Sequence, residues 1–324
     1  MSELRYDLLD DRWTLYAPGR AARPHDVPLA FVRAPRPAFD PLCPFCPGNE
    51  DRLAGILFER RGPHPEVPWA TRVVPNKYPI VSGNAVPADA RAGLGGSHEV
   101  VIETPRHDRQ LADMATDEIE AILDTYRGRF LAHAARAAWT VAFRNHGPSA
   151  GISLLHAHGH VLSTLTLPPL VEAREWRAER FFSETGRCHL CEALAHEQRE
   201  GGRLVRETDR LAAFVPYAAE VRFELWVVPR RHCSDFAFAS DAELVELGSL
   251  LKTLLGDLRR QAGDPDYNFV ILSATATRRA SPAWHWLLRL RPRTTAIGGF
   301  ELASGVAVNP SLPEIDAAQL RGGQ

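Results

Sequence analysis

The sequence predicts an α+β fold of two modules related by internal duplication, each a mainly antiparallel sheet with a packed helix. Two Cys-x-x-Cys pairs, beginning at Cys43 and Cys188, lie 145 residues apart. Each pair is followed in the same order by an apolar strand, a histidine, an amphipathic helix, a second strand and a second histidine. Because this order occurs twice, we interpret the chain as two domains, residues 1–165 and 166–324.

Composition limits the function classes. With 324 residues and 45% hydrophobic content, the chain can bury enough apolar surface for two domains. Its formal net charge of −2 lacks the basic excess that nucleic acid or an anionic membrane attracts, so we expect neither as a partner. No apolar run approaches the roughly 20 residues that span a bilayer, and residues 1–10 lack a signal-peptide core. The five cysteines (two pairs plus Cys233) fit metal ligation in a reducing compartment, which predicts a cytoplasmic protein.

The first 42 residues are rich in Pro and Arg and show little periodicity, so we expect extended chain and turns there. Arg20 and Arg23 are three positions apart in this segment, and such a pair can fork onto phosphate oxygens. A solvated basic loop is the simpler explanation of this pair taken alone.

In the first half, apolar runs at 72–75 and 99–103 predict strands, separated by a turn at Asn76-Lys77-Tyr78-Pro79. Thr116 is expected to cap a helix whose first turn carries acids, which the helix dipole favours. The core-facing stripe of this helix comprises Ile119, Ile122, Leu123, Tyr126, Phe130 and Leu131. A strand at 139–144 then leads into a glycine-rich loop.

The second half repeats this order after a charged and aromatic segment, residues 170–187, that is interpreted as a connecting helix or linker. Strands are expected at 225–228, 267–273 and 286–291. Ser240-Asp241-Ala242-Glu243 is a capping box that opens a leucine-rich helix between the first two of these strands.

Each half supplies two cysteines and two histidines that together suit a zinc ion. The first set is Cys43, Cys46, His107 and His156, and the second is Cys188, Cys191, His232 and His285. The two histidines of a set are 49 residues apart in one half and 53 in the other. Two thiolates and two imidazoles fill a tetrahedral site, so we expect two structural zinc ions, the second supported less strongly. The alternative, a redox-active Cys-x-x-Cys, lacks a thioredoxin-like context here.

The stretch from Asn145 to His160 is the candidate reaction site. A loop containing Gly147, Ser149, Gly151 and Ser153 offers backbone N–H groups that suit an approaching phosphate. Behind it His156, His158 and His160 alternate, which places their imidazoles on one face of a strand.

If zinc fixes His156, then His158 is held in position to attack phosphorus. The counterparts of His158 and His160 in the second half are Leu287 and Arg289, so only the first module is expected to be catalytic. A histidine cluster that binds metal without chemistry is the alternative.

These motifs together resemble the galactose-1-phosphate uridylyltransferase family of the histidine-triad superfamily, including its ADP-glucose phosphorylase-like branch. The resemblance rests on Cys-x-x-Cys-Pro-Gly-Asn, the Asn76–Pro79 turn, the stretch from Asn145 to His158, and Gly298-Gly299-Phe300-Glu301. It covers nearly the whole chain and implies two histidine-triad-like modules, of which the second is degenerate and carries a sugar-side loop.

The resemblance also implies a ping-pong nucleotidyl transfer and a role for each matching residue. His158 would attack the α-phosphorus of a nucleotide sugar, and His160 would act beside it. Asn76 and Asn145 would contact the nucleoside, and Gly151 and Ser153 would contact the α-phosphate. Arg20 and Arg23 would reach phosphate from the neighbouring subunit of a homodimer. Phe300 and Glu301 would lie near the sugar.

One departure from the family leaves the acceptor open. Transferases of this family usually carry Gln where this chain has His160, and histidine can also carry charge and move a proton. Three functions therefore stay open: transfer to a sugar 1-phosphate, transfer to phosphate or water (as in an ADP-glucose phosphorylase or a dinucleoside polyphosphate hydrolase), and nucleotide binding without catalysis. The sequence names neither the base nor the sugar.

Overall fold

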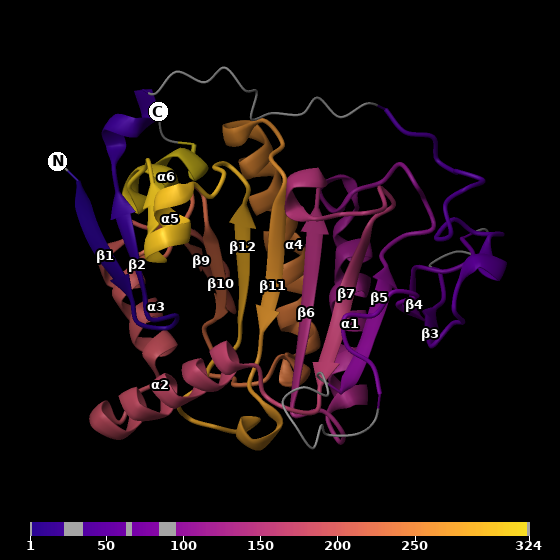
Figure 1. Cartoon of the computed structure of the whole chain (residues 1–324), viewed down its shortest axis with the longest axis horizontal. Coiled ribbons are helices and arrows are strands. Elements are labelled where there is room, and N and C mark those ends of the chain that lie inside the picture. Colours follow the sequence, from indigo (N-terminus) through magenta and orange to yellow (C-terminus); the bar gives the residue numbers. More distant parts are fainter. Residues whose placement is uncertain (1, 23–34, 63–66, 84–94, 323–324) are drawn as a thin grey trace.

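The computed structural model describes residues 2–22, 35–62, 67–83 and 95–322, so Arg23 lies outside the described residues. One ten-stranded antiparallel sheet forms the centre of the molecule (Figure 1). The first half contributes β3 (Phe58–Arg60), β4 (Thr71–Pro75), β5 (Gly96–Ile102), β6 (Trp139–His146) and β7 (His158–Thr164). The second half contributes β8 (Leu204–Glu207), β9 (Leu211–Phe214), β10 (Leu225–Pro229), β11 (Tyr267–Leu272) and β12 (Leu287–Pro292).

The strand order of the sheet is palindromic. It runs β3-β4-β5-β7-β6 and then β11-β12-β10-β9-β8, so each strand of one half has a counterpart at the mirrored position in the other. The halves meet where β6 pairs antiparallel with β11, with Asn145 opposite Asn268. This arrangement is consistent with the predicted duplication, and the two halves on either side of the predicted domain boundary at residue 165 share one continuous sheet.

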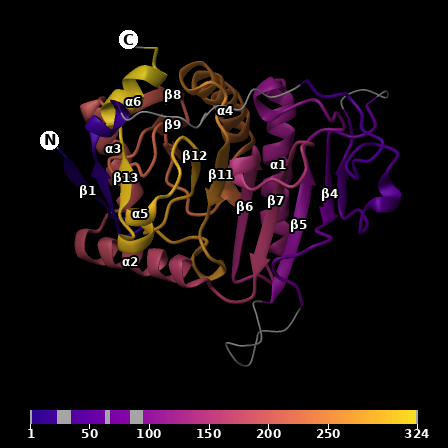
Figure 2. The same cartoon turned by 45° about the horizontal axis from the view of Figure 1, so that its top comes forward.

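Helices α1 (Thr116–His133) and α4 (Asp241–Ala262) pack side by side on one face of the sheet (Figures 1 and 2). Ser240 caps α4 as predicted, because its hydroxyl accepts the Glu243 N–H at 3.2 Å. The expectation for α1 was wrong in two details. Ala115, not Thr116, is the N-cap, and Leu131 is 50% exposed because it lies one position past the buried stripe.

The opposite face of the second half is covered by α2 (Pro169–Thr185), α3 (His189–Glu200) and a small sheet (Figure 1). That small sheet contains β1 (Glu3–Asp7), β2 (Arg12–Tyr16) and β13 (Ala307–Asn309), with α5 (Gly299–Ser304) and α6 (Pro313–Leu320) beside it. The N-terminal hairpin β1–β2 therefore packs on the second half, where Tyr16 donates a hydrogen bond to the Ala219 carbonyl at 2.9 Å.

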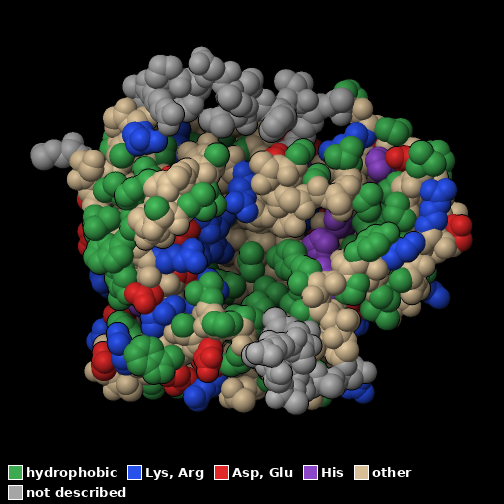
Figure 3. All heavy atoms as spheres, viewed as in Figure 1, with side chains coloured by type: hydrophobic (Ala, Val, Ile, Leu, Met, Phe, Trp, Pro, Cys, Tyr) green, Lys and Arg blue, Asp and Glu red, His purple; other side chains and the backbone are tan. Residues whose placement is uncertain are grey.

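The middle of this face is left open. Figure 3 shows a hollow there, bordered by histidine side chains on one side and by Lys and Arg side chains on the other. On the face of the sheet that carries His160, Val81, Val141 and Leu162 form a small apolar cluster, with Phe143 and Val270 packed against it. No helix within the described ranges is long and apolar enough to cross a membrane.

Candidate active site and metal centres

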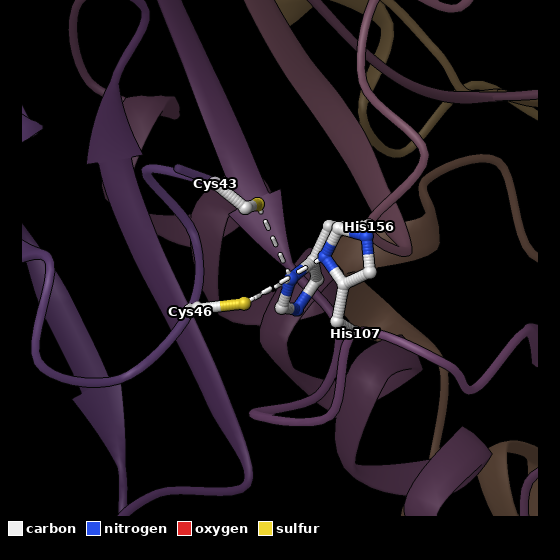
Figure 4. Close-up of side chains that lie close together, drawn as sticks. All are labelled: Cys43, Cys46, His107 and His156. Atoms are coloured by element: carbon white, nitrogen blue, oxygen red, sulfur yellow. Dashed lines mark hydrogen bonds between the residues drawn. The ribbon is translucent and has the colours of Figure 1, made fainter. Parts of the chain in front are cut away.

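The structure brings the first predicted ligand set together (Figure 4). Cys43 and Cys46 lie in a loop before β3, His107 follows β5, and His156 precedes β7. Their ligand atoms all lie within 4.8 Å of one another, and Cys43 Sγ is 3.6 Å from His156 Nδ1. All four side chains are buried, so the chain segments converge on one point inside the protein.

The protonation of His156 suits metal binding. Its Nε2 lies 2.7 Å from the Thr104 carbonyl oxygen, which can only accept a hydrogen bond, so Nε2 carries the proton. Nδ1 is then unprotonated and faces the two thiols. A backbone carbonyl that orients a metal-binding histidine in this way is a common outer-shell arrangement. Two cysteines and two histidines at these distances fit a closed zinc site.

The second predicted set also comes together. Cys188 and Cys191 lie at the start of α3, His232 follows β10, and His285 precedes β12. Cys191 Sγ is 3.4 Å from Nδ1 of both His232 and His285. His232 is exposed, so this cluster is more open to solvent than the first.

His158 is the first residue of β7, and its neighbours decide which of its ring nitrogens carries the proton. Its Nδ1 lies 2.7 Å from the His156 carbonyl oxygen and must therefore donate to it, which leaves Nε2 with a free electron pair. Burial lowers the pKa of His158, so the ring is neutral at neutral pH. The ring lines a narrow cleft at the adjoining ends of β6 and β7, together with Asn145 and Gly147.

A buried ion pair supports β7 from the helix side of the sheet. Arg144 on β6 donates to Glu103 at 2.8 Å, and Tyr126 on α1 donates to the other oxygen of Glu103 at 2.9 Å. Because β5 and β6 flank β7, this pair connects the two neighbours of the His158 strand. Sequence reasoning missed both charged residues, although each interrupts an apolar strand pattern.

The second half contributes directly to the site through Asn268 on β11. Its side-chain amide donates to Asn145 Oδ1 at 2.7 Å and to the Ala150 carbonyl at 2.9 Å. By the register of the sheet, Asn145 and Asn268 continue the cross-strand row that begins at His158. Asn145 is therefore held with its amide N–H groups available for a ligand, by a residue that the sequence did not single out.

The glycine-rich loop is also fixed from the second half. Ser149 donates both its backbone N–H and its hydroxyl to Asp266, each at 2.7 Å. Gly147 has φ of 87°, and a Cβ added there would lie 1.7 Å from a carboxylate oxygen of Asp266. We call the contacts of Asp266 with Ser149 and Gly147 the clamp. Gly151, at φ of 92°, and Ser153 are exposed between this clamp and β7, where they are accessible to a phosphate group.

We expect Gly147→Ala to lower the nucleotidyl transfer that the resemblance implies at least tenfold, and stability by at least about 2 kcal/mol, because a methyl group would displace Asp266 from the loop. The rate of sugar 1-phosphate release and the melting temperature measure these effects. The control is Gly186→Ala, at φ of 70° with nothing within 4 Å of the added Cβ. It should cost about 1 kcal/mol and leave transfer unchanged. Equal effects on transfer would refute the role of the clamp.

The remaining predicted residues lie apart from His158 or contact other groups. Arg20 is exposed in a short 3-10 turn, Pro18–Ala22. Phe300 and Glu301 lie on α5, which is beside the small sheet and distant from β7 (Figures 1 and 2). Asn76 contacts the ring of His98. The substrate contacts assigned to these residues stay predictions.

His160 lies two residues after His158 on the same face of β7. Its ring stacks on Phe143, with centroids 4.8 Å apart, and its Nδ1 is 3.1 Å from His98 Nε2. Burial, then the neighbouring His158 and His98 rings, lowers the pKa of His160 to about 3. His160 is therefore neutral at neutral pH, whereas the sequence suggested that it can carry charge there.

Comparisons with known proteins agree with these motifs. Residues 76–168 match the family model for the N-terminal domain of galactose-1-phosphate uridyl transferase. The chain is 35% identical to ADP-glucose phosphorylase of Arabidopsis thaliana, over 98% of this chain and 92% of the relative. It is 26% identical to galactose-1-phosphate uridylyltransferase of Thermotoga maritima, over 99% of this chain and 98% of the relative.

Two solved structures have the same fold along their whole length. The crystal structure of the Arabidopsis thaliana ADP-glucose phosphorylase with bound ADP-glucose superposes with a TM-score of 0.86 at 34% identity, covering 100% of this chain and 99% of the other. A uridylyltransferase structure superposes with a TM-score of 0.75 at 26% identity, covering 99% of this chain and 98% of the other. The chain therefore belongs to the galactose-1-phosphate uridylyltransferase family, which also includes ADP-glucose phosphorylase, and its relatives are enzymes of nucleotidyl transfer.

Proposed function

We propose that this protein transfers a nucleoside monophosphate from a nucleotide sugar to inorganic phosphate through a covalent intermediate on His158. In the first step Nε2 of His158 attacks the α-phosphorus, and the bond to the bridging oxygen breaks. Sugar 1-phosphate leaves with that electron pair. In the second step a phosphate oxygen attacks the same phosphorus, the P–N bond breaks, and a nucleoside diphosphate is released.

The observation that carries this proposal is the hydrogen bond from His158 Nδ1 to the His156 carbonyl. It fixes the tautomer in which Nε2 is the nucleophile, and it connects that ring to the backbone of a residue in the first cysteine–histidine cluster. Because Nε2 of His158 carries no proton, no base has to deprotonate it before it attacks phosphorus.

The choice of acceptor and donor rests on relatedness. Identity to the ADP-glucose phosphorylase is 35%, against 26% to the Thermotoga maritima uridylyltransferase, at similar coverage. We therefore propose ADP-glucose or a similar nucleotide sugar as donor and phosphate as acceptor. The second candidate is transfer to a hexose 1-phosphate, which the full-length similarity to the uridylyltransferase and the matching family model favour.

We also propose that each cysteine–histidine cluster binds one zinc ion. Four protein ligands leave no position for substrate, so these ions would stabilise the fold and supply no step of the reaction. The donor sets and the distances between their ligand atoms support this assignment.

We further propose that the protein is cytoplasmic and forms a homodimer. The free cysteines are consistent with a reducing compartment. The exposed position of Arg20 is consistent with its reaching the phosphates of a neighbouring subunit.

The test is a screen of ADP-, UDP- and GDP-sugars labelled at the α-phosphorus. After quenching, we expect an acid-labile adduct with ADP-glucose, and we expect a phosphate chase to release labelled ADP faster than water or a hexose 1-phosphate releases label. A faster chase by hexose 1-phosphate would support the second candidate. Labelling by none of the three sugar classes would leave only a nucleotide-binding protein.

A further inference from the structure

A chain of hydrogen bonds leads from the Asn76–Pro79 turn to His160. The Tyr78 N–H donates to Asn76 Oδ1 at 2.9 Å, so the other end of the Asn76 amide, Nδ2, is a donor. This Nδ2 lies 3.2 Å from His98 Nδ1 and 3.3 Å from His98 Nε2. The Ile80 N–H also donates to His98 Nδ1, at 3.2 Å.

The Ile80 N–H fixes the tautomer of His98, and the Asn76 amide then donates to the same Nδ1 and not to Nε2. A backbone N–H can only donate, so Nδ1 of His98 accepts from Ile80 and carries no proton. Burial lowers the pKa of His98 and keeps its ring neutral, so its single proton is on Nε2. That Nε2–H lies 3.1 Å from Nδ1 of His160 and donates to it.

The same logic then applies to His160. Its Nδ1 accepts from His98, so the proton of its neutral ring is on Nε2. The ring is stacked on Phe143 at an interplanar angle of 20°, which resists a ring flip that would turn Nδ1 away from His98. The rings of His158 and His160 are 5.2 Å apart between centroids, so a group bound at His158 is within reach of this N–H.

We propose that His98 is a positioning residue that holds His160 as the neutral Nε2–H tautomer, so that His160 donates one hydrogen bond to the phosphoryl group attacked by His158. In this state His160 presents what a glutamine amide would present, an N–H without a charge. The opposite tautomer would point a lone pair at an anion. The inference rests on the proposed function for the identity of the acceptor oxygen, whereas the tautomer itself does not depend on that function.

Two variants separate this role from a merely structural one. His98→Gln keeps an amide N–H close to the position of the imidazole Nε2–H and a carbonyl that can accept from Ile80. His98→Leu keeps apolar bulk and removes both groups. We expect His98→Leu to slow sugar 1-phosphate release from ADP-glucose by 10- to 100-fold, the order of an oxyanion-stabilising donor. His98→Gln should recover the rate to within about threefold of the unmodified protein, and neither variant should alter bound metal.

Nitrogen-15 NMR of histidine-labelled protein reads the tautomers directly. In the unmodified protein, His160 should show a protonated Nε2 and an unprotonated Nδ1, and His158 the reverse. His98→Gln should keep this pattern, and His98→Leu should give a mixture of tautomers at His160. These spectra need no substrate, so they decide the tautomer even if the variant with leucine fails to fold.

Two results would overturn the inference: a proton on Nδ1 of His160 in the unmodified protein, or equal loss of rate in both variants. Failure of the proposed function would look different. Nucleotide sugars would then give no adduct, while the NMR pattern at His160 would still be the one expected here.

Discussion

His158→Gly should abolish covalent labelling by nucleotide sugar and lower turnover at least about 1000-fold, because it removes the imidazole whose Nε2 lone pair is the proposed nucleophile. The expectation follows from the tautomer of His158. Its Nδ1 donates a hydrogen bond to the His156 carbonyl, so its Nε2 is unprotonated and can act as the nucleophile. Glycine removes the ring and leaves the backbone of residue 156 in place. Quench-flow labelling and steady-state turnover measure the effect.

The metal content should distinguish loss of the nucleophile from loss of the fold. We expect His158→Gly to keep the same bound metal per chain and a melting temperature within a few degrees of the unmodified protein. His196→Ala is the matched control, because that histidine is exposed on α3 and should change neither labelling nor turnover. Residual labelling above a tenth of normal in His158→Gly would contradict the mechanism.

Cys43→Ser should remove one metal ion per chain and lower the melting temperature by at least about 10 °C. A structural zinc ion contributes its binding free energy to folding, and losing several kcal/mol of it produces a shift of this size in a chain of this length. Turnover should fall as well, because the first cluster fixes the backbone from which His158 is oriented. Metal analysis and calorimetry are the measurements.

Cys233→Ser is the matched control for this change. Cys233 is also buried, and its thiol donates to the Asp235 carbonyl at 3.3 Å without belonging to either cluster. The same substitution there should keep the metal content and most of the stability. If Cys43→Ser and Cys233→Ser give the same metal content, the first cluster is not a metal site.

Much of this protein follows from its sequence. The two ligand sets could be predicted because zinc requires specific residue types, and the same order of elements carries them in both halves. The alternation of His156, His158 and His160 predicted three rings on one face of a strand. This holds for His158 and His160, whereas His156 precedes β7 and its ring belongs to the first cluster. The Ser240 cap could be predicted equally well, since all hydrogen bonds of a capping box form between residues at most three positions apart.

Only the tertiary structure showed which groups act on those side chains. Asp266 and Asn268 reach the glycine-rich loop because β11 pairs with β6, and that pairing joins residues more than 100 positions apart. His98 faces His160 through the register of β5 against β7. No local pattern encodes such neighbours, because strand register depends on the burial of a whole sheet face. The sequence by itself thus pointed to the residues proposed to carry the chemistry, and the fold decided their protonation and orientation through hydrogen bonds between distant strands.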